Sequence, residues 1–376
     1  MKVAVLKETD PNESRVGLVP DGVKFLKKKE LEVVVEKDAG LQAGFLDSQY
    51  EELGASIAPD AAATVSGADV VLKVLPPTTD EVGVLSKDHI LACSLQPVLN
   101  LEVVKALKDA GVTTMAMDLM PRITRAQTMD ILSSQATVAG YKAVLLGANA
   151  IGKFLPMLTT AAGTIRPAKA LILGAGVAGL QAIATCRRLG ATVSAFDVRP
   201  AVKEQVESLG AKFLEMELEA DAEDEGGYAK ELSKDQHEKE LELIGEALKV
   251  TDLVITTAQI PGKKAPVLIT RDMVEMMQPG SAIVDLAAET GGNCELSEAG
   301  ETVVHQEITI LGPRNLPASL PFHASQMLSK NLVTFITEML DDEGNLALNW
   351  ENEVLDGVCV THQGEIRHQP TKEALG

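Results

Sequence analysis

Aromatic side chains are scarce in this sequence of 376 residues, where they make up 3% of the positions. The cores must therefore be built from aliphatic residues, which account for most of the 45% of positions that are hydrophobic. That share, together with the lack of low-complexity tracts, excludes a disordered chain. The length suffices for roughly two domains of about 150–200 residues each.

Positive charge is also in deficit. The chain has 34 Lys and Arg against 54 Asp and Glu, which gives a formal net charge of −20. Because nucleic acids reward clustered Lys and Arg, this balance argues against a nucleic-acid partner.

Cysteines are few, and long hydrophobic runs are missing. Cys93, Cys186, Cys294 and Cys359 form no C-x-x-C pair and have no histidine at ligand spacing, so we expect no metal site. Scattered free thiols fit a reducing cytosol or matrix. Charge interrupts the first stretch, MKVAVLKETD, which excludes a signal peptide, and no uncharged run reaches about 18 residues. We therefore expect a soluble cytoplasmic chain with no direct membrane insertion.

Short β-branched runs alternate with helical patterns along the chain. Toward the amino terminus the predicted strands are 2–6, 32–35, 69–74, 90–94 and 113–117, and the helical patterns include 22–29 and 101–110. The alternation restarts with predicted strands at 168–173, 192–197, 253–257 and 282–286 and helices at 177–189 and 201–209. Strands separated by helices indicate parallel sheets covered on both faces.

The stretch 121–135, PRITRAQTMDILSSQ, interrupts this alternation and leads into a long helix that Ser133 or Ser134 can cap. The apolar stripe expected on that helix is Ala139, Ala143, Leu146, Ala150 and Phe154. A second long helical pattern, at about 325–340, can return the chain to the first domain. We predict an α/β fold of two doubly wound, Rossmann-like parallel-sheet domains, joined by two long helices with a cleft between them. The predicted domains are residues 1–133 with 325–376, and residues 134–324.

Residues 215–240 do not fit the alternation. A run of acidic residues leads into Gly226, Gly227 and Tyr228, and a charged segment follows. Blocks of like charge repel and stay hydrated, so a solvated surface loop is one interpretation. The other is a mobile lid hinged at the two glycines, because long loops in compact domains are often functional.

Residues 171–179, LILGAGVAG, place G-x-G-x-x-G directly after a strand pattern and directly before a helix. In a dinucleotide-binding fold, Gly174 gives the tight turn, Gly176 lets the backbone approach the pyrophosphate, and Gly179 lets helix and strand pack closely. The amino terminus of the helix then offers N–H groups and positive potential to the phosphates.

An acidic residue follows at the expected distance. Asp197 ends the next predicted strand, where a carboxylate accepts hydrogen bonds from ribose hydroxyls and repels a 2′-phosphate. The pattern predicts NAD(H) as the cofactor. Arg199 can attract a 2′-phosphate, which is the minority interpretation.

A dinucleotide fold does not name a reaction. A conventional dehydrogenase needs an acid or base beside the nicotinamide. The six histidines belong to no such motif, and we expect them on the surface or in loops.

Several motifs together resemble a known family. The chain resembles the NAD(H)-binding component, domain I, of proton-translocating nicotinamide nucleotide transhydrogenase. The segments that carry the resemblance, in matching order and spacing, are GAGVAGLQAIATCRRLGATVSAFDVRP, PRITRAQTMDILSSQAT, GGYAKE, TTAQIPGKKAPVLIT and VDLAAETGGNCE. The similarity runs through essentially the whole chain. It implies direct hydride transfer from NADH to NADP⁺, in which no hydroxyl or amine loses a proton and the protein holds two rings close together. The lack of an evident base then has an explanation.

The resemblance also implies partners. It implies a homodimer that presents NADH to NADP(H) held on a separate domain III, while a membrane domain II couples the exchange to proton passage. The chain would then be cytoplasmic and peripheral on the inner face of the cell membrane through those partners.

Roles for individual residues follow from the same resemblance. On the nicotinamide side, Arg122, Asp130 and Ser133 orient the carboxamide and ring, Gln127 reaches toward the NADP(H) partner, and Ile123, Thr124 and Arg125 add cofactor contacts. On the adenosine side the matching residues are Val177, Asp197, Val198 and Arg199, and the loop that closes over the nucleotide is matched by Gly227 and Tyr228. Gln259, a further predicted cofactor contact, stands where the family usually has an apolar residue. Without the resemblance, the 121–135 stretch reads equally well as a polar interdomain linker with a helix cap.

Alanine dehydrogenase is the neighbouring family. Arg15 in NESRVGLVP and Lys73 in VLKVLPP resemble its substrate-binding positions. Its catalytic histidine falls at Gln96, and the acidic residue of its V-D-x-A-x-D-Q-G-G motif falls at Glu289. A neutral amide at position 96 cannot cycle a proton near neutral pH, which disfavours amino-acid oxidation. An enzyme like alanine dehydrogenase and an NAD-sensing module without turnover stay as alternatives.

Overall fold

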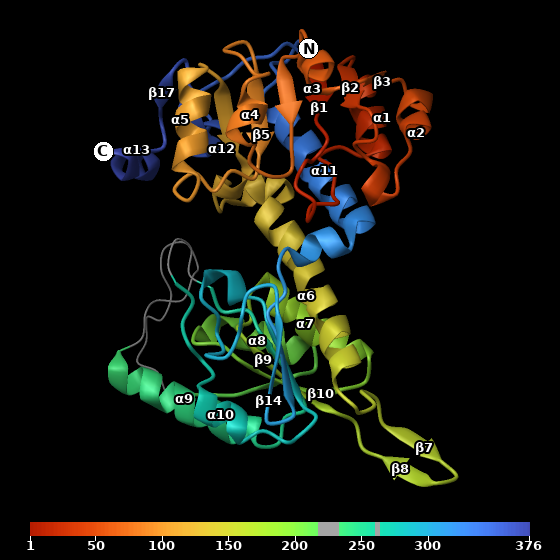
Figure 1. Ribbon diagram of the computed structural model, residues 1–376, viewed down its shortest axis with the longest axis vertical. Helices are drawn as coiled ribbons and strands as arrows, with labels where there is room; N and C mark the ends of the chain where they lie inside the picture. Colours follow the sequence, from red (N-terminus) through yellow and green to blue (C-terminus); the bar gives the residue numbers. More distant parts are fainter. Residues whose placement is uncertain (217–232, 260–263) are drawn as a thin grey trace. The chain divides into compact units, whose positions relative to one another are not determined.

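The structure is a computed structural model that describes residues 1–216, 233–259 and 264–376. The chain divides into two compact units, residues 1–135 with 317–376 and residues 136–316 (Figure 1).

Helix α6 (Ile131–Ala150) contains the first crossing between the units. The chain returns within the 3₁₀ helix η6 (Leu316–Ser319), which precedes helix α11 (Pro321–Glu338). Helix α11 therefore lies wholly in the first unit, whereas the sequence predicted that two long helices join the domains.

The first unit is built on an eight-stranded sheet in the order β17-β16-β6-β5-β4-β1-β2-β3. Its strands are β1 (Lys2–Val5), β2 (Glu32–Glu36), β3 (Ser56–Ala58), β4 (Val70–Leu72), β5 (Ile90–Cys93), β6 (Thr113–Ala116), β16 (Cys359–His362) and β17 (Glu365–Ile366). The six strands β6-β5-β4-β1-β2-β3 are parallel, β16 pairs antiparallel with β6, and β17 pairs antiparallel with β16.

Both faces of this sheet are buried. Val3 and Val5 belong to one hydrophobic cluster, whereas Ala4 between them belongs to another. Such alternation is expected when helices cover a parallel sheet on both sides. The helical segments of the unit are α1 (Pro20–Lys28), η1 (Leu41–Ala43), α2 (Asp47–Glu52), α3 (Ala61–Val65), α4 (Thr79–Val82), α5 (Leu101–Asp109), η2 (Met117–Leu119), η3 (Thr124–Met129), α11, α12 (Glu353–Val358) and α13 (Gln369–Leu375).

The second unit has a seven-stranded sheet in the order β11-β10-β9-β12-β13-β15-β14. Its strands are β9 (Lys169–Leu173), β10 (Thr192–Phe196), β11 (Lys212–Phe213), β12 (Leu253–Thr256), β13 (Ala282–Asp285), β14 (Thr302–His305) and β15 (Ile308–Leu311). All pairs are parallel except β14 with β15. A separate two-stranded hairpin, β7 (Leu158–Thr160) with β8 (Gly163–Ile165), projects from this unit (Figure 1).

Helices cover this sheet as well, because Ile172 and its neighbour Leu173 belong to different hydrophobic clusters. Besides most of α6, the helical segments are α7 (Val177–Arg188), η4 (Pro200–Val202), α8 (Lys203–Ser208), α9 (Lys234–Leu248), α10 (Arg271–Glu275) and η5 (Ala288–Thr290). The arrangement is the predicted α/β class with two sheets in which parallel pairs predominate. Every predicted strand is present, with ends that agree within two residues.

Two local predictions about helices were wrong. Helix α6 starts at Ile131, and the Asp130 carboxylate accepts a hydrogen bond from Ser133 N at 3.0 Å, so Asp130 caps the helix in place of Ser133 or Ser134. The helix ends at Ala150, and Phe154, expected on its buried stripe, is 57% exposed.

The predicted charged loop at 215–240 also needs correction from Lys234 onward. Helix α9 begins there, capped by the Ser233 hydroxyl, because Glu240, Ile244 and Leu248 recur at helical spacing and are buried. Gly226, Gly227 and Tyr228 lie outside the described residues.

All four cysteines are buried as free thiols. Within the described ranges, no helix is both long enough and apolar enough to cross a membrane. The same ranges hold no group of three His, Cys, Asp or Glu side chains arranged to bind a metal ion.

Candidate functional site

The candidate site lies at the carboxyl edge of the second sheet. Strand β9 lies between β10 and β12. The chain therefore continues to one side of β9 through β10 and β11, and then crosses to the other side at β12. In open α/β sheets, ligands bind outside the carboxyl ends of the strands at such a switch point. The turn after β9 leads directly into α7, whose first N–H groups have no partner within the helix.

Each glycine of this turn occupies a different environment. Gly174 has φ +94°, a left-handed conformation that glycine adopts at no steric cost. A methyl group on Gly179 would lie 1.9 Å from the Gly174 carbonyl oxygen, so helix and strand approach as closely as a side-chain-free residue permits. A methyl on Gly176 would meet no atom within 4 Å, so the helix end there faces open space. That space fits a pyrophosphate against the helix N–H groups.

Asp197 follows β10 and binds the glycine turn itself. Its Oδ2 atom accepts a hydrogen bond from Ala175 N at 2.7 Å. The same carboxylate is paired with Arg199, with 2.8 Å between Nη2 and Oδ2. Asp197 is therefore placed beside the turn, at the strand end where a ribose would bind.

Two buried polar residues, which the sequence did not single out, hold the neighbouring turns. The Asn293 side chain accepts a hydrogen bond from Ala258 N at 3.1 Å and donates to the Ala258 and Pro266 carbonyl oxygens. The Asp285 carboxylate accepts hydrogen bonds from Thr256 Oγ1 at 2.8 Å and from Cys294 N at 3.0 Å. Both lie in the VDLAAETGGNCE segment, which was the available signal.

The other predicted contacts that the structure describes in this unit lie along its carboxyl edge. Val177 is the first residue of α7 and is 42% exposed, and Val198 packs partly buried against the core. The Gln259 side chain donates a hydrogen bond to the Leu286 carbonyl oxygen at 3.0 Å. Gly227 and Tyr228 lie outside the described residues, so their role stays a prediction.

In the first unit, the predicted nicotinamide-side residues lie in the segment 122–133, which includes η3 and the start of α6. Asp130 accepts hydrogen bonds from Ser133 N and from Ser133 Oγ, the latter at 2.5 Å, so these two side chains form one unit. Arg122, Thr124 and Gln127 are exposed, and Ile123 is partly buried against the core.

Helix α11 and the segment after it hold this loop. Asn331 Nδ2 donates a hydrogen bond to the Thr128 carbonyl oxygen at 2.8 Å. The Arg125 guanidinium donates to Asn352 Oδ1 at 2.6 Å and lies 3.3 Å from Glu338 Oε2. Arg125 thus ties the loop to Glu338 and Asn352, and its contact with a cofactor stays a prediction.

The residues that resemble alanine dehydrogenase also lie in the first unit. Arg15 pairs with both oxygens of Glu13 and donates a hydrogen bond to Gln135. Lys73 lies 2.8 Å from Glu8 Oε2, and both side chains are buried. Burial acts to lower the pKa of Lys73, but the nearby acidic groups, Glu8 foremost and then Glu81, together raise that pKa.

Position 96 has no titratable side chain. Gln96 adopts a left-handed φ of +47°, and its backbone N donates a hydrogen bond to Asp118 at 2.9 Å. Burial raises the pKa of the Asp118 carboxyl. The acidic candidate Glu289 is exposed on η5 of the second unit. An amide at position 96 offers no proton acceptor for amine oxidation.

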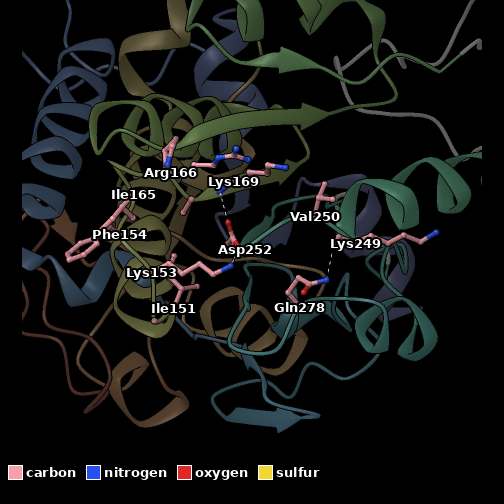
Figure 2. A pocket seen from close by; sticks show the side chains of 13 residues that line it. Ile151, Lys153, Phe154, Ile165, Arg166, Lys169, Lys249, Val250, Asp252 and Gln278 are labelled. Carbon is pink, nitrogen blue, oxygen red and sulfur yellow. Dashed lines mark hydrogen bonds and ion pairs between the residues drawn. The ribbon is translucent and has the colours of Figure 1, made fainter. Parts of the chain in front are cut away.

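A pocket of about 780 Å³ occupies the opposite, amino edge of the second sheet, around the start of β9 (Figure 2). Lys153 Nζ lies 2.5 Å from Asp252 Oδ1 inside it, and the Asp252 carboxylate also accepts a hydrogen bond from Lys169 N. Among the described residues, none of the predicted nucleotide contacts lines this pocket. It lacks the glycine turn and helix amino terminus that a dinucleotide needs, so we do not assign the nucleotide to it.

Known families match nearly the whole chain. The alanine dehydrogenase/PNT N-terminal domain matches residues 4–139, and the alanine dehydrogenase/PNT C-terminal domain matches residues 143–369. The chain belongs to the alanine dehydrogenase/PNT family.

Its relatives include proteins named as transhydrogenase subunits and proteins named as alanine dehydrogenases. An NAD(P) transhydrogenase subunit alpha polypeptide of Rhodospirillum rubrum is 50% identical over 376 residues, covering 98% of each chain. The alanine dehydrogenase of Halomonas elongata is 30% identical over 385 residues, covering 100% of this chain and 97% of that one. A crystal structure of transhydrogenase from Sinorhizobium meliloti matches with a TM-score of 0.85 and 44% identity, covering 98% of this chain and 99% of that chain. The higher identity supports a transhydrogenase subunit over an alanine dehydrogenase.

Proposed function

We propose that this chain is the NAD(H)-binding subunit of a proton-translocating transhydrogenase, and that it passes a hydride between NADH and NADP⁺ held by a separate polypeptide. The observation that carries the proposal is the glycine turn, where Gly176 opens the start of α7 to a ligand and Asp197 lies beside it. The 50% identity with a transhydrogenase subunit supports the choice of reaction.

The proposed reaction requires the chain to orient the nicotinamide ring and does not require an acid or a base. Hydride transfer between two nicotinamide rings removes no proton from a hydroxyl or an amine, so a neutral Gln96 is no obstacle. Orientation of the rings can supply about 7–11 kcal/mol of the barrier. Arg122, Asp130 and Ser133 would orient the carboxamide of NADH, and the bonded Asp130–Ser133 pair supports that role because it is already fixed.

The partners follow from the same proposal. NADP(H) would be bound by domain III, and a membrane domain II would couple the exchange to proton translocation. The chain would stay cytoplasmic and attach to the inner face of the cell membrane only through these subunits. Sedimentation with membranes only when those subunits are co-expressed is the expected result.

A deuterium-transfer assay tests the reaction. The chain is mixed with domain III loaded with NADP⁺ and with NADH carrying deuterium at the transferred position. We expect NADPH that retains the deuterium, detected by mass spectrometry, because direct transfer never releases the atom to solvent. NADPH without deuterium would contradict direct transfer.

Two further mixtures separate the alternatives. Alanine formation from NADH, pyruvate and ammonia would favour the alanine-dehydrogenase interpretation, which Arg15 and Lys73 suggest. NADH binding without turnover in either mixture would leave an NAD-sensing module.

Gln127 provides a test of the face toward the NADP(H) partner. Gln127→Ala should leave NADH affinity unchanged and slow hydride exchange with domain III, because the exposed amide is assigned to the partner side. Gln42→Ala is the matched control, since Gln42 is also exposed on a 3₁₀ helix of the same unit. A collapse of NADH affinity in Gln127→Ala would place that side chain on the cofactor.

A homodimer is the remaining element of the proposal. Two-stranded hairpins are at best marginally stable alone in water. Phe154, Met157 and Ile165, within β7–β8 or just before it, are 57%, 62% and 42% exposed. We expect these residues to be covered by the second copy. In analytical ultracentrifugation, Met157→Lys should give monomer, while Leu99→Lys, a change at an exposed residue of the first unit, should stay dimeric. Dimeric Met157→Lys would place the interface elsewhere.

A further inference from the structure

The Asp197 carboxylate already has its full set of hydrogen-bond donors. Oδ1 accepts from Arg199 N and from Arg199 Nε, each at 2.9 Å. Oδ2 accepts from Ala175 N at 2.7 Å and from Arg199 Nη2 at 2.8 Å. A carboxylate offers about four acceptor positions, so the protein itself occupies all of them.

These four donors differ in how easily a ligand can displace them from Asp197. Ala175 N and Arg199 N are backbone groups, and moving them would distort the glycine turn or the segment after β10. The guanidinium sits on a flexible side chain that is 16% exposed, whereas the Asp197 side chain is 6% exposed. Ribose hydroxyls can therefore gain acceptor positions on Asp197 mainly by displacing the guanidinium.

We propose that Arg199 is a specificity-determining residue. Its guanidinium occupies the acceptor positions on Asp197 that the ribose hydroxyls need, and it must release the carboxylate when NAD(H) binds. The inference rests on the proposed function, because it takes the carboxyl edge of the second sheet as the NAD(H) site. It goes beyond that function by assigning to Arg199 a competition with the ribose.

The competition has two consequences for nucleotide choice. Breaking the forked contact with Asp197 costs free energy, which weakens NAD(H) binding. The guanidinium also offsets the Asp197 charge that would repel a 2′-phosphate, and once released it can pair with that phosphate through its own fork. Arg199 thus lowers the preference for NAD(H) over NADP(H) on both counts.

Binding measurements on three variants test this inference. Arg199→Met keeps much of the side-chain length without charge, and it should bind NADH roughly 5- to 30-fold more tightly, as expected for the loss of one or two competing charge-assisted hydrogen bonds. Its affinity for NADPH should fall, so the ratio of the two dissociation constants should rise by at least the gain for NADH. Arg199→Lys should give an intermediate ratio, because a single ammonium cannot make the forked contact.

Arg188→Met is the matched control. It removes one positive charge from an exposed position in the last turn of α7, the helix whose other end carries the glycine turn. Both dissociation constants should stay as in the unsubstituted chain. Calorimetry gives the constants, and thermal unfolding without ligand confirms that each variant is folded.

Weaker NADH binding by Arg199→Met, or an unchanged ratio, would overturn the inference. So would a crystal structure of the unsubstituted chain with NADH in which the guanidinium still bonds both oxygens of Asp197. This structural readout decides the matter even where a variant fails to fold. If the unsubstituted chain binds no NADH at all, the proposed function fails instead, and the two failures are distinguishable.

Discussion

Adding one methyl group at two neighbouring glycines separates the role of the turn in folding from its role in binding. In Gly179→Ala the new methyl would lie 1.9 Å from the Gly174 carbonyl oxygen and 2.9 Å from its carbon, both backbone atoms. In Gly176→Ala the methyl would meet no atom within 4 Å, and the backbone there, at φ −72°, suits any residue.

The expected magnitudes follow from these distances. Carbon and oxygen in tight contact stay roughly 3.3 Å apart, so the methyl on residue 179 must move helix or strand by more than about 1 Å. Overpacking of this kind costs about 1–3 kcal/mol, with the upper end favoured where backbone must move, and alanine recovers about 1 kcal/mol as a better helix former. The net loss is about 2 kcal/mol, or roughly 4–8 °C in Tm for a unit of this size.

Gly176→Ala should have little effect on stability and a large effect on NADH affinity. Alanine is a poorer helix cap than glycine, so its stability should fall by at most about 1 kcal/mol. Its methyl would stand where the pyrophosphate approaches the helix end, and NADH affinity should drop at least about tenfold. Calorimetric melting and NADH titration measure the two effects. The reasoning is refuted if Gly179→Ala melts no lower than Gly176→Ala, or if Gly176→Ala binds NADH like the unsubstituted chain.

Two further predictions concern the cores. Tyr50 is fully buried, and its hydroxyl donates a hydrogen bond to the Leu18 carbonyl oxygen at 2.9 Å. Tyr50→Phe should therefore lower the free energy of unfolding, measured by urea titration, by about 1–3 kcal/mol. An unchanged free energy of unfolding would mean that this hydrogen bond contributes nothing. The four thiols are buried, and burial raises the pKa of Cys186 to about 12 and that of Cys294 to about 11. Since only the thiolate reacts, native chain should resist iodoacetamide at pH 8 and unfolded chain should take up four labels; rapid native labelling would contradict the burial.

The glycine turn shows how far the sequence alone can lead. The spacing of Gly174, Gly176 and Gly179 between a β-branched run and a helical pattern predicted the turn, because these requirements act over a few adjacent residues. The nine predicted strands were found for a similar reason, because each is a short apolar run that needs burial on both faces. Three further parallel strands, β3, β11 and β15, were missed.

Other elements depend on residues distant in sequence. Strand β16 pairs with β6, which places Cys359 opposite Met115, and β14 pairs with β15 at the far edge of the second sheet. Such short strands carry little periodic signal, because pairing with distant partners fixes them. The charged start of α9 was misassigned because its buried stripe becomes evident only where the helix packs on the sheet.

Within the site, the sequence determined which residues gather at the carboxyl edge, since the ends of neighbouring parallel strands must meet there. It did not determine their partners. Tertiary structure alone decided that Asp197 bonds the glycine turn and Arg199, and that Asn293 fixes the segment after β12. The physical reason is that a polar side chain at a strand end can reach several donors, and packing of the folded chain selects among them.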